Sequence, residues 1–242
     1  MTDLHIWVGY DPREPLSYKT CVHSIREVAS PGVTIHKLDT MELRQKGLFS
    51  REWKINAEGQ YLDILDGKPF STWFAYTRFL VPYLARKIGA KHALFMDSDM
   101  VMFSDPALLL SQINSSAGVS VVKHDFSDPN PRKMDGMMQT NYRRKLWSAF
   151  MVFDTFNPYC QDLTPDEVNT RPGSFLHQLD WMPDSMIGSL EHGWQYIPGH
   201  SDSYDGALHC MHFTQGTPEM PKYVNAKGNE VWLKAFLRAS QN

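Results

Sequence analysis

The sequence predicts an α/β fold with a mixed, mainly parallel sheet flanked by helices. Short apolar strands alternate with helical segments along the chain, an order that favours parallel strands joined by crossover helices. The 242 residues are 42% hydrophobic and 12% aromatic, which suffices for a continuous core. No repeat, low-complexity run or linker interrupts the chain, so we expect a single domain over residues 1–242.

The first elements follow from turn signals. Residues 4–9 are typical of a strand that a Gly-Tyr-Asp-Pro turn ends, and a helix is expected over residues 15–28, since Pro15 suits the first helical turn. A Ser-Pro-Gly break then leads to a predicted strand over residues 33–38. The mixed polar stretch of about residues 40–70 is interpreted as an insertion that forms a flap near the site.

The later elements are read in the same way. Apolar residues at helical spacing predict a helix over residues 72–87, in which Pro82 is expected to cause a kink or an early end. We further expect strands over residues 93–96, 118–122, 147–153 and 193–197, and helices from residue 105, over 172–181 and over 225–239. A second insertion, about residues 125–146, has the composition of a mobile loop.

Charge and cysteine content exclude several classes. The formal charge of −3 provides no basic field that attracts nucleic acid or an anionic membrane. Cys21, Cys160 and Cys210 lie far apart and form no CxxC pair, which indicates free thiols in a reducing compartment. The sequence has neither a signal-peptide pattern nor an apolar run of membrane-spanning length. We therefore expect a cytoplasmic protein.

Two carboxylates are the most informative feature. Asp97 and Asp99 stand one residue apart between apolar runs at 93–96 and 100–103, each typical of a buried strand. Because ionised groups are costly to place beside a core, a cation is expected against them, and a hard divalent metal is the natural choice. Asp99 is expected to bind it directly, and Asp97 directly or through water. A polar turn at the strand end is the alternative.

A histidine near the C-terminus adds to this pair. His212 lies in a short apolar stretch in which strand alternation places it on one side with Cys210, and His209 on the other. An imidazole with two carboxylates suits Mn²⁺, with Mg²⁺ as the harder alternative. A core histidine is the other interpretation, and we prefer it for His209. Gly216 favours a backbone that approaches a phosphate closely.

The turn after the first strand is interpreted as a nucleotide cradle formed by Val8, Gly9, Tyr10, Asp11 and Arg13. Its tyrosine can stack on a base, its aspartate can accept a hydrogen bond from the base or ribose, and its arginine can meet a phosphate. The same turn can simply connect a strand to a helix, and that alternative stays open.

Arg78 lies among apolar residues of the helix predicted over residues 72–87. A charge in such surroundings usually needs an acidic partner. A salt bridge to Asp97 and a direct contact with a sugar or diphosphate are equal alternatives for it.

Two further carboxylates, Asp180 and Asp184, flank an aromatic residue, Trp181. A carboxylate beside an aromatic ring is a common way to bind sugar hydroxyls together with the apolar face of the sugar. Either aspartate is a candidate general base for an acceptor hydroxyl, if the reaction inverts. An ordinary turn at the end of a helix is the alternative interpretation.

In order along the chain, these segments resemble the GT-A glycosyltransferases, especially family 8 and related bacterial and phage enzymes. The resemblance is carried by residues 6–15, 76–79, 95–99, 147–151, 187–190 and 212–216. It implies a Rossmann-like GT-A fold, a metal held by Asp97, Asp99 and His212, and a nucleotide in the turn after the first strand. Tyr76 and Ser98 belong to the same segments, and we expect them among the donor-binding residues.

One departure from the family pattern concerns its C-terminal motif, His-x-x-Gly-x-x-Lys-Pro-Trp. Here one residue is inserted before Gly216, and Pro218 and Glu219 stand where the diphosphate-binding lysine and its neighbours are expected. Lys222 is the expected substitute, unless that contact is missing.

Together these features predict a metal-dependent glycosyltransferase that uses a UDP- or GDP-linked sugar. The expected acceptor is a hydroxyl of a glycan, of a lipopolysaccharide or capsule precursor, or of a modified nucleobase, which is the one way in which nucleic acid enters. A nucleotidyltransferase and an inert sugar-nucleotide or glycan-binding module are alternatives. A metallohydrolase using His209 and His212 ranks last, because the HExxH spacing is absent.

Overall fold

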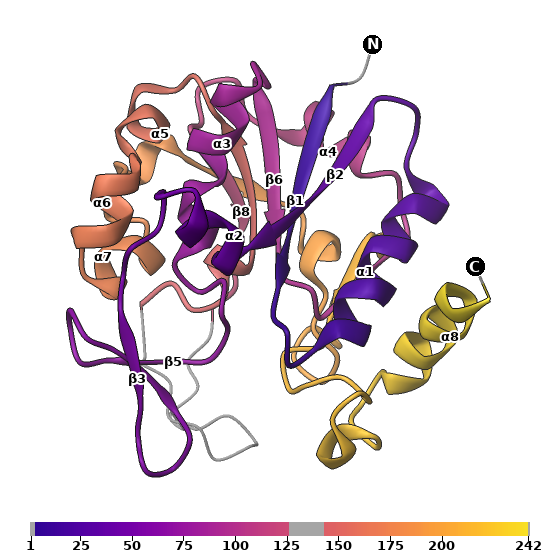
Figure 1. The fold of residues 1–242 in the computed structure, drawn as a ribbon. Helices are drawn as coiled ribbons and strands as arrows, with labels where there is room; N and C mark the ends of the chain where they lie inside the picture. The colour runs from indigo at the N-terminus through magenta and orange to yellow at the C-terminus, as the bar shows by residue number, and fades with distance from the viewer. Residues whose placement is uncertain (1–2, 126–142, 242) are drawn as a thin grey trace.

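The structure is a computed structural model that describes residues 3–125 and 143–241 (Figure 1). Within these residues a six-stranded central sheet consists of β1 (Leu4–Tyr10), β2 (Val33–Asp39), β6 (His92–Met96), β8 (Val119–Val122), β9 (Phe150–Asp154) and β10 (Ile187–Leu190). Its strand order is β10-β8-β9-β6-β1-β2. Strand β9 is antiparallel to both of its neighbours, and the other pairs are parallel. The predicted mixed, mainly parallel α/β fold is therefore confirmed.

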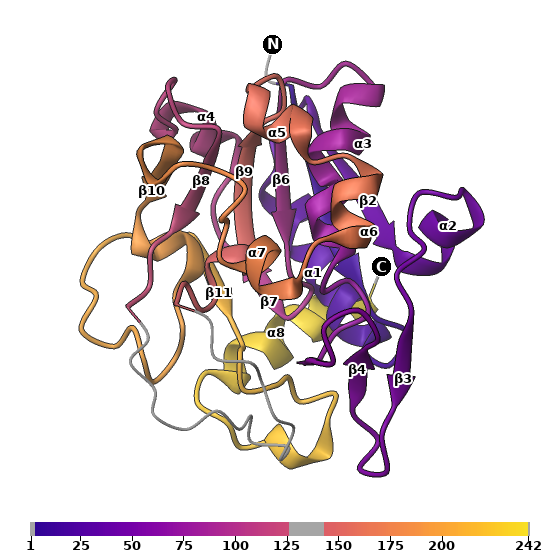
Figure 2. The same cartoon turned by 90° about the vertical axis from the view of Figure 1, so that its left-hand side faces the viewer.

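Strand alternation sends the side chains of the sheet into two cores. On β1, Ile6 and Val8 belong to one core and Trp7 to the other. The first core lies under α1 (Pro15–Val28), and the second is covered by α3 (Val81–Lys87), α5 (Pro158–Asp162), α6 (Pro165–Thr170) and α7 (Gly173–His177). Figures 1 and 2 show these two sets of helices on opposite faces of the sheet. Burial on both faces explains the continuous apolar runs of the strands.

The C-terminal part of the chain closes the α1 side. Helix α8 (Asn229–Ser240) packs against α1 in Figure 1, and Arg238 forms an ion pair with Glu27 at 2.8 Å. Strands β7 (Met100–Met102) and β11 (Cys210–His212) form a separate antiparallel pair. Trp232 of α8 covers this pair in a third apolar cluster. The C-terminal segment, with β11 and α8, thus packs against β7, the strand that follows β6.

The stretch of residues 40–70, predicted as an insertion, has structure of its own. It contains α2 (Thr40–Gln45) and a small antiparallel sheet of β3 (Trp53–Ile55), β4 (Tyr61–Asp63) and β5 (Pro69–Phe70). Arg51 fastens this sheet to the domain, because its guanidinium makes two 2.8 Å hydrogen bonds to Asp63 and donates to the carbonyl of Val168 at 3.2 Å. Its charged carbon also lies 4.0 Å from the centre of the Tyr76 ring.

Two predicted helices have different bounds. The helix expected over residues 72–87 is instead a 3-10 helix, η1 (Thr77–Leu80), followed by α3. Pro82 lies in the first turn of α3, where its missing N–H is not needed, so the proline marks a helix start and not a kink. The helix expected over residues 172–181 is α7, which ends at His177, because Leu179 takes a left-handed backbone conformation with φ of 57°.

Two predicted strands also need correction. The strand expected over residues 193–197 is wrong, since its first part is the 3-10 helix η5 (His192–Gln195) and the strand of this region is β10. The strand expected over residues 147–153 begins with η3 (Trp147–Ala149) and becomes extended only from Phe150. Short helices η2 (Pro106–Leu108), α4 (Leu109–Gln112), η4 (Asp184–Met186) and η6 (Pro221–Tyr223) complete the elements. Most of the loop predicted after residue 125 lies outside the described residues.

Helix length and polarity bear on the membrane prediction. Among residues 3–125 and 143–241, no helix is both long enough and apolar enough to cross a bilayer.

Candidate metal and donor site

Strand pairing explains why Asp99 and His212 meet although 113 positions separate them in the chain. Asp97 and Asp99 follow the carboxyl end of β6, and β7 begins at the next residue. The antiparallel register of β7 and β11 sets His212 opposite Met100, and the backbone N–H of Phe213 donates to the carbonyl of Asp99 at 2.9 Å. The histidine is thereby delivered to the carboxylates by backbone geometry.

The three side chains form a compact donor set. One ligand atom each of Asp97, Asp99 and His212 lies within 4.8 Å of the other two, and Nε2 of His212 is 3.2 Å from Oδ1 of Asp99. His212 is buried, whereas both carboxylates are half-buried. Two carboxylate oxygens and one imidazole nitrogen are a donor set that suits Mn²⁺ or Mg²⁺. The residues that the sequence singles out for a metal therefore fit such an ion.

Arg78 is the cation beside this set. Its guanidinium lies 3.1 Å from Oδ1 of Asp97 and donates to the carbonyl of Ser148 at 2.8 Å, so the ion pair expected as one alternative is present. A contact of Arg78 with a sugar or diphosphate stays a prediction. Burial lowers the pKa of Arg78, and the negative charges of Asp97 and Asp99 oppose this shift. The arginine offsets part of the negative charge that the two carboxylates would otherwise concentrate there.

Sequence reasoning missed three polar residues around the site. Gln195 is fully buried, and its Nε2 lies 3.1 Å from Nδ1 of His212. Oγ of Ser148 lies 3.0 Å from Nδ1 of His177. Burial, followed by the charges of Arg78 and Arg51, lowers the pKa of His177 well below its ordinary value. No local pattern marks these residues, because each has its partner in a distant segment.

The predicted nucleotide turn is tied to the rest of the fold. The carboxylate of Asp11 is 1% exposed and accepts hydrogen bonds from the Arg13 backbone at 3.0 Å, from the Arg13 guanidinium at 2.9 and 2.5 Å, and from the Trp73 backbone at 3.1 Å. The side chain of Val8 is buried in the core. A Cβ at Gly9 would lie 2.6 Å from the Phe74 ring, so glycine is needed here for packing. A nucleotide contact of these residues stays a prediction.

The other predicted donor residues have identifiable neighbours within the protein. Tyr10 is half-buried and stacks edge-on against Tyr18 at 5.2 Å, with the ammonium of Lys37 3.7 Å from its ring centre. Tyr76 and Ser98 are both buried. For these three residues too, contact with a donor stays a prediction.

Asp180 and Asp184 are not part of the group formed by Asp97, Asp99 and His212. Both are exposed: Asp184 lies 2.5 Å from the guanidinium of Arg144, and Asp180 lies 3.8 Å from that of Arg143. The hydrogen bond from Arg144 lowers the pKa of the Asp184 carboxyl below its ordinary value. Their role as general base stays a prediction.

The segment after His212, which departs from the family's C-terminal motif, makes contacts within the protein. Glu219 accepts hydrogen bonds from the backbone N–H groups of Leu16 at 3.0 Å and Ser17 at 2.8 Å, so it caps the first turn of α1. Gly216 has φ of +133°, and a Cβ there would lie 2.1 Å from a ring carbon of Tyr223. The glycine thus allows close packing on that ring. Its approach to a phosphate stays a prediction.

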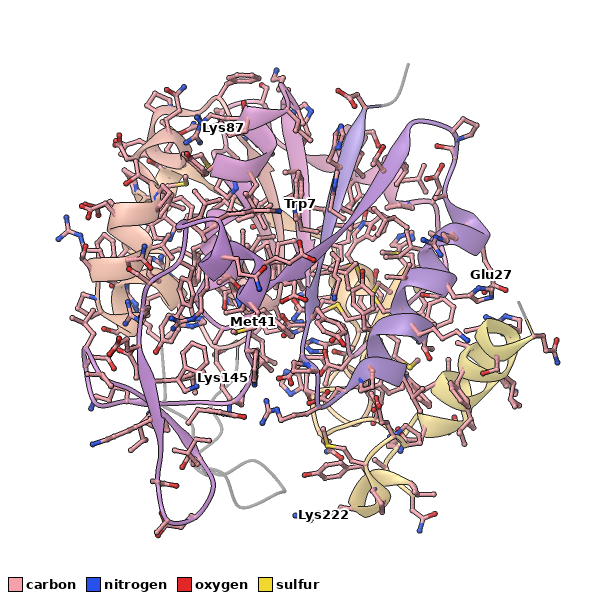
Figure 3. All side chains as sticks on the ribbon, in the orientation of Figure 1. Trp7, Glu27, Met41, Lys87, Lys145 and Lys222 are labelled. Atoms are coloured by element: carbon pink, nitrogen blue, oxygen red, sulfur yellow. The ribbon has the colours of Figure 1, made fainter. Side chains whose placement is uncertain are left out.

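Two lysines lie near this segment. Lys222 is exposed on η6, and Figure 3 shows it with Lys145 toward the end of the molecule where β1 ends, opposite Lys87. Lys227, which the sequence did not single out, lines a small hollow together with His212 and Gly216. It is paired with Asp202.

Comparison with solved structures identifies the fold. The chain is similar to the bifunctional glycosyltransferase WbbM, with a TM-score of 0.59, 12% identity, and 99% of this chain and 51% of that chain covered. It is similar to GlyE of Streptococcus pneumoniae TIGR4, with a TM-score of 0.58, 12% identity, and 98% of this chain and 61% of that chain covered. It is also similar to the galactosyltransferase LgtC in complex with donor and acceptor sugar analogues, with a TM-score of 0.57, 9% identity, and 97% of this chain and 95% of that chain covered. The chain thus spans about half of WbbM and three fifths of GlyE. The predicted GT-A glycosyltransferase fold is confirmed.

Sequence comparison gives the family. No family model matches the chain. Protein CDI of Arabidopsis thaliana is 34% identical over 232 residues, which cover 94% of this chain and 84% of that protein. At this identity over nearly its whole length, the chain, with its GT-A fold, belongs to the same family as Protein CDI.

Proposed function

We propose that this protein is a metal-dependent glycosyltransferase that moves a sugar from a nucleoside diphosphate sugar to an acceptor hydroxyl. The observation that carries the proposal is the group of Asp97, Asp99 and His212, whose ligand atoms lie within 4.8 Å of one another at the carboxyl end of β6. In open α/β sheets, ligands bind at the carboxyl ends of the strands. The GT-A fold supports the same reaction class.

The chain's own residues have definable tasks in this reaction. Asp97, Asp99 and His212 would hold Mn²⁺ or Mg²⁺, which when bound neutralises the negative charge that develops on the leaving diphosphate. Arg78 holds Asp97 through its 3.1 Å ion pair and is itself fixed by the carbonyl of Ser148. The carboxylate therefore keeps its orientation without reorganising when the donor binds.

The donor would extend from the metal-binding group toward the segment around Gly216. Lys227 lines the hollow beside His212, and Lys222 is exposed on η6. We expect one of these lysines to contact the diphosphate of the donor. Replacing that lysine, in Lys222→Ala or in Lys227→Ala, should raise the KM for the donor and leave kcat nearly unchanged. An unchanged KM in both variants would remove lysine from the donor site.

The remaining proposals concern the acceptor, the nucleotide of the donor, the extent of the catalytic domain and the location of the protein. Asp180 or Asp184 would serve as the base for the acceptor hydroxyl, and the acceptor is a glycan, a lipopolysaccharide or capsule precursor, or a modified nucleobase. The donor is UDP- or GDP-linked, residues 1–242 act as one catalytic domain, and the protein works in the cytoplasm. The exposure of both aspartates supports their access to an acceptor.

The test is release of nucleoside diphosphate from a panel of UDP-, GDP- and CDP-sugars, with and without Mn²⁺. We expect release that depends on the metal and falls more than about 100-fold in Asp99→Asn. The matched control is Asp154→Asn, an aspartate at the end of β9 that stands opposite His92 in the register with β6, at the amino end of β6. It should retain full activity.

The possible outcomes separate the two candidate functions. Donor binding without turnover, for any acceptor offered, would favour an inert sugar-nucleotide-binding module. Equal release by wild type and Asp99→Asn would contradict the role of the metal-binding group, and absence of any donor binding would refute the transferase proposal.

A further inference from the structure

The side chain of Gln195 occupies a pivotal place behind the metal-binding group. It is fully buried in η5, and its Nε2 lies 3.1 Å from Nδ1 of His212 and 3.1 Å from the carbonyl oxygen of Leu146. Backbone hydrogen bonds hold the two segments together, since the N–H of His212 donates to the carbonyl of Tyr196 at 2.8 Å. The amide is therefore held against the ring nitrogen that faces away from the carboxylates.

The position of the imidazole proton decides whether His212 can bind a metal. A neutral imidazole carries one proton, and a metal at Nε2 requires that this proton be on Nδ1. With the amide nitrogen of Gln195 facing Nδ1, that atom accepts a hydrogen bond and the proton lies on Nε2. Nε2 faces Oδ1 of Asp99, 3.2 Å away. In this tautomer Nε2 has no free lone pair for a metal.

The side-chain amide is suited to serve the other tautomer as well. Its Oε1 has no hydrogen-bond partner among the described residues, although it is buried. Turning the amide over brings this oxygen to Nδ1, where it accepts from the N–H, and frees the lone pair of Nε2. The carbonyl of Leu146 then loses the amide donor but keeps its hydrogen bond from the N–H of Ala149 at 3.0 Å. The turned amide thus leaves this carbonyl oxygen with a hydrogen bond.

We propose that Gln195 is a positioning residue that selects the metal-binding tautomer of His212, by turning its amide from donor to acceptor when the ion binds. This inference rests on the metal site of the proposed function. It also links the metal to residue Leu146, whose left-handed backbone, with φ of 69°, precedes η3. The carbonyl of Ser148 in η3 is the one that Arg78 binds, so both sides of the site meet in this short helix.

The experiment measures Mn²⁺ binding directly, without turnover. Free Mn²⁺ is followed by electron paramagnetic resonance during titration, and the nitrogen modulation of the bound ion reports a coordinated imidazole. Gln195→Leu removes the acceptor, so we expect affinity to fall about 10- to 100-fold and the nitrogen modulation to weaken. Gln195→Glu keeps an acceptor for Nδ1–H, so its affinity should stay within about threefold of wild type.

A second glutamine provides the matched control. Oε1 of Gln112 accepts a hydrogen bond from the indole of Trp194 at 2.8 Å, and Trp194 directly precedes Gln195 in the chain. Gln112→Leu should lower stability against urea and leave Mn²⁺ affinity unchanged. Gln195→Glu should also lower stability against urea, because a carboxylate cannot donate to the carbonyl of Leu146, and it should likewise leave Mn²⁺ affinity nearly unchanged.

The outcomes distinguish the inference from the proposed function. Wild-type affinity and modulation in Gln195→Leu would overturn the role of Gln195 and leave the metal site standing. Should that variant not fold, a 10-fold or larger loss in Gln195→Glu would overturn it equally. Absence of Mn²⁺ binding by wild type would refute the metal site itself, and the inference with it.

Discussion

His124 makes the stability of this protein depend on pH in a way that can be calculated. The ring is 4% exposed, its Nε2 lies 3.0 Å from the carbonyl oxygen of Gln195, and the rings of His192 and His200 are centred 5.2 and 5.8 Å away. Burial first, and then the neighbouring histidines His192, His212 and His200, lower the pKa of His124 to about 3 from an ordinary value of 6.5. The folded protein therefore keeps this ring neutral in mild acid.

The unfolded chain behaves differently. Its histidine takes up a proton below the ordinary pKa of 6.5, whereas the folded ring does so only near pH 3. Protonation at His124 thus has no effect on stability well above pH 6.5, and it destabilises the fold progressively as the pH falls from about 6.5 toward 3. At about pH 5 the pH lies about 1.5 units below the pKa of the unfolded chain, and each unit costs about 1.4 kcal/mol. The free energy of unfolding is therefore lower by about 2 kcal/mol.

The perturbation is His124→Gln, whose amide can donate to the same carbonyl of Gln195 but does not titrate. Urea unfolding of metal-free protein at about pH 7.5 and about pH 5 gives the free energy of unfolding for both chains. We expect wild type to lose about 2 kcal/mol more than the variant between these two values. Since His177 and the other histidines are present in both chains, their contributions cancel. Equal losses in the two proteins would refute the reasoning.

Three further changes test packing around the site by urea unfolding. Arg51→Met leaves Asp63 buried without its ion-pair partner, so we expect a loss of about 3–5 kcal/mol, and a loss under about 1 kcal/mol would contradict this. Glu219→Ala uncaps the first turn of α1 and should cost about 1 kcal/mol; an unchanged unfolding midpoint would argue against the cap. Gly216→Ala should cost about 2–4 kcal/mol, from its φ of 133° and from a Cβ placed 2.1 Å from a tyrosine ring. Gly47→Ala, which also has a positive φ (70°) but free space around the added Cβ, should cost only about 1 kcal/mol.

Local pattern was sufficient for the class of fold and for the Asp-Asp-His group that the structure brings together. Alternation of apolar strands with helical segments reflects periodicities of two and 3.6 residues, which are properties of neighbouring positions in the chain. Asp97 and Asp99 could be identified for the same reason, because their cost beside buried strands is local. His212 followed from the chemistry of its side chain and from the glycine turn after it.

Tertiary contacts decided the remainder, because the relevant partners are distant in sequence. Residues 193–197 have the apolar pattern of a strand, yet η5 forms there, and Gln195 is directed at His212. The choice of Asp97 as the partner of Arg78 needed the fold of η1 against β6. Glu219 caps α1, from which about 200 positions separate it in the chain. The local sequence around Glu219 indicates only that the lysine of the family pattern is absent there. A hydrogen bond or an ion pair depends on where side chains meet in space, and the pattern along the chain carries no record of that.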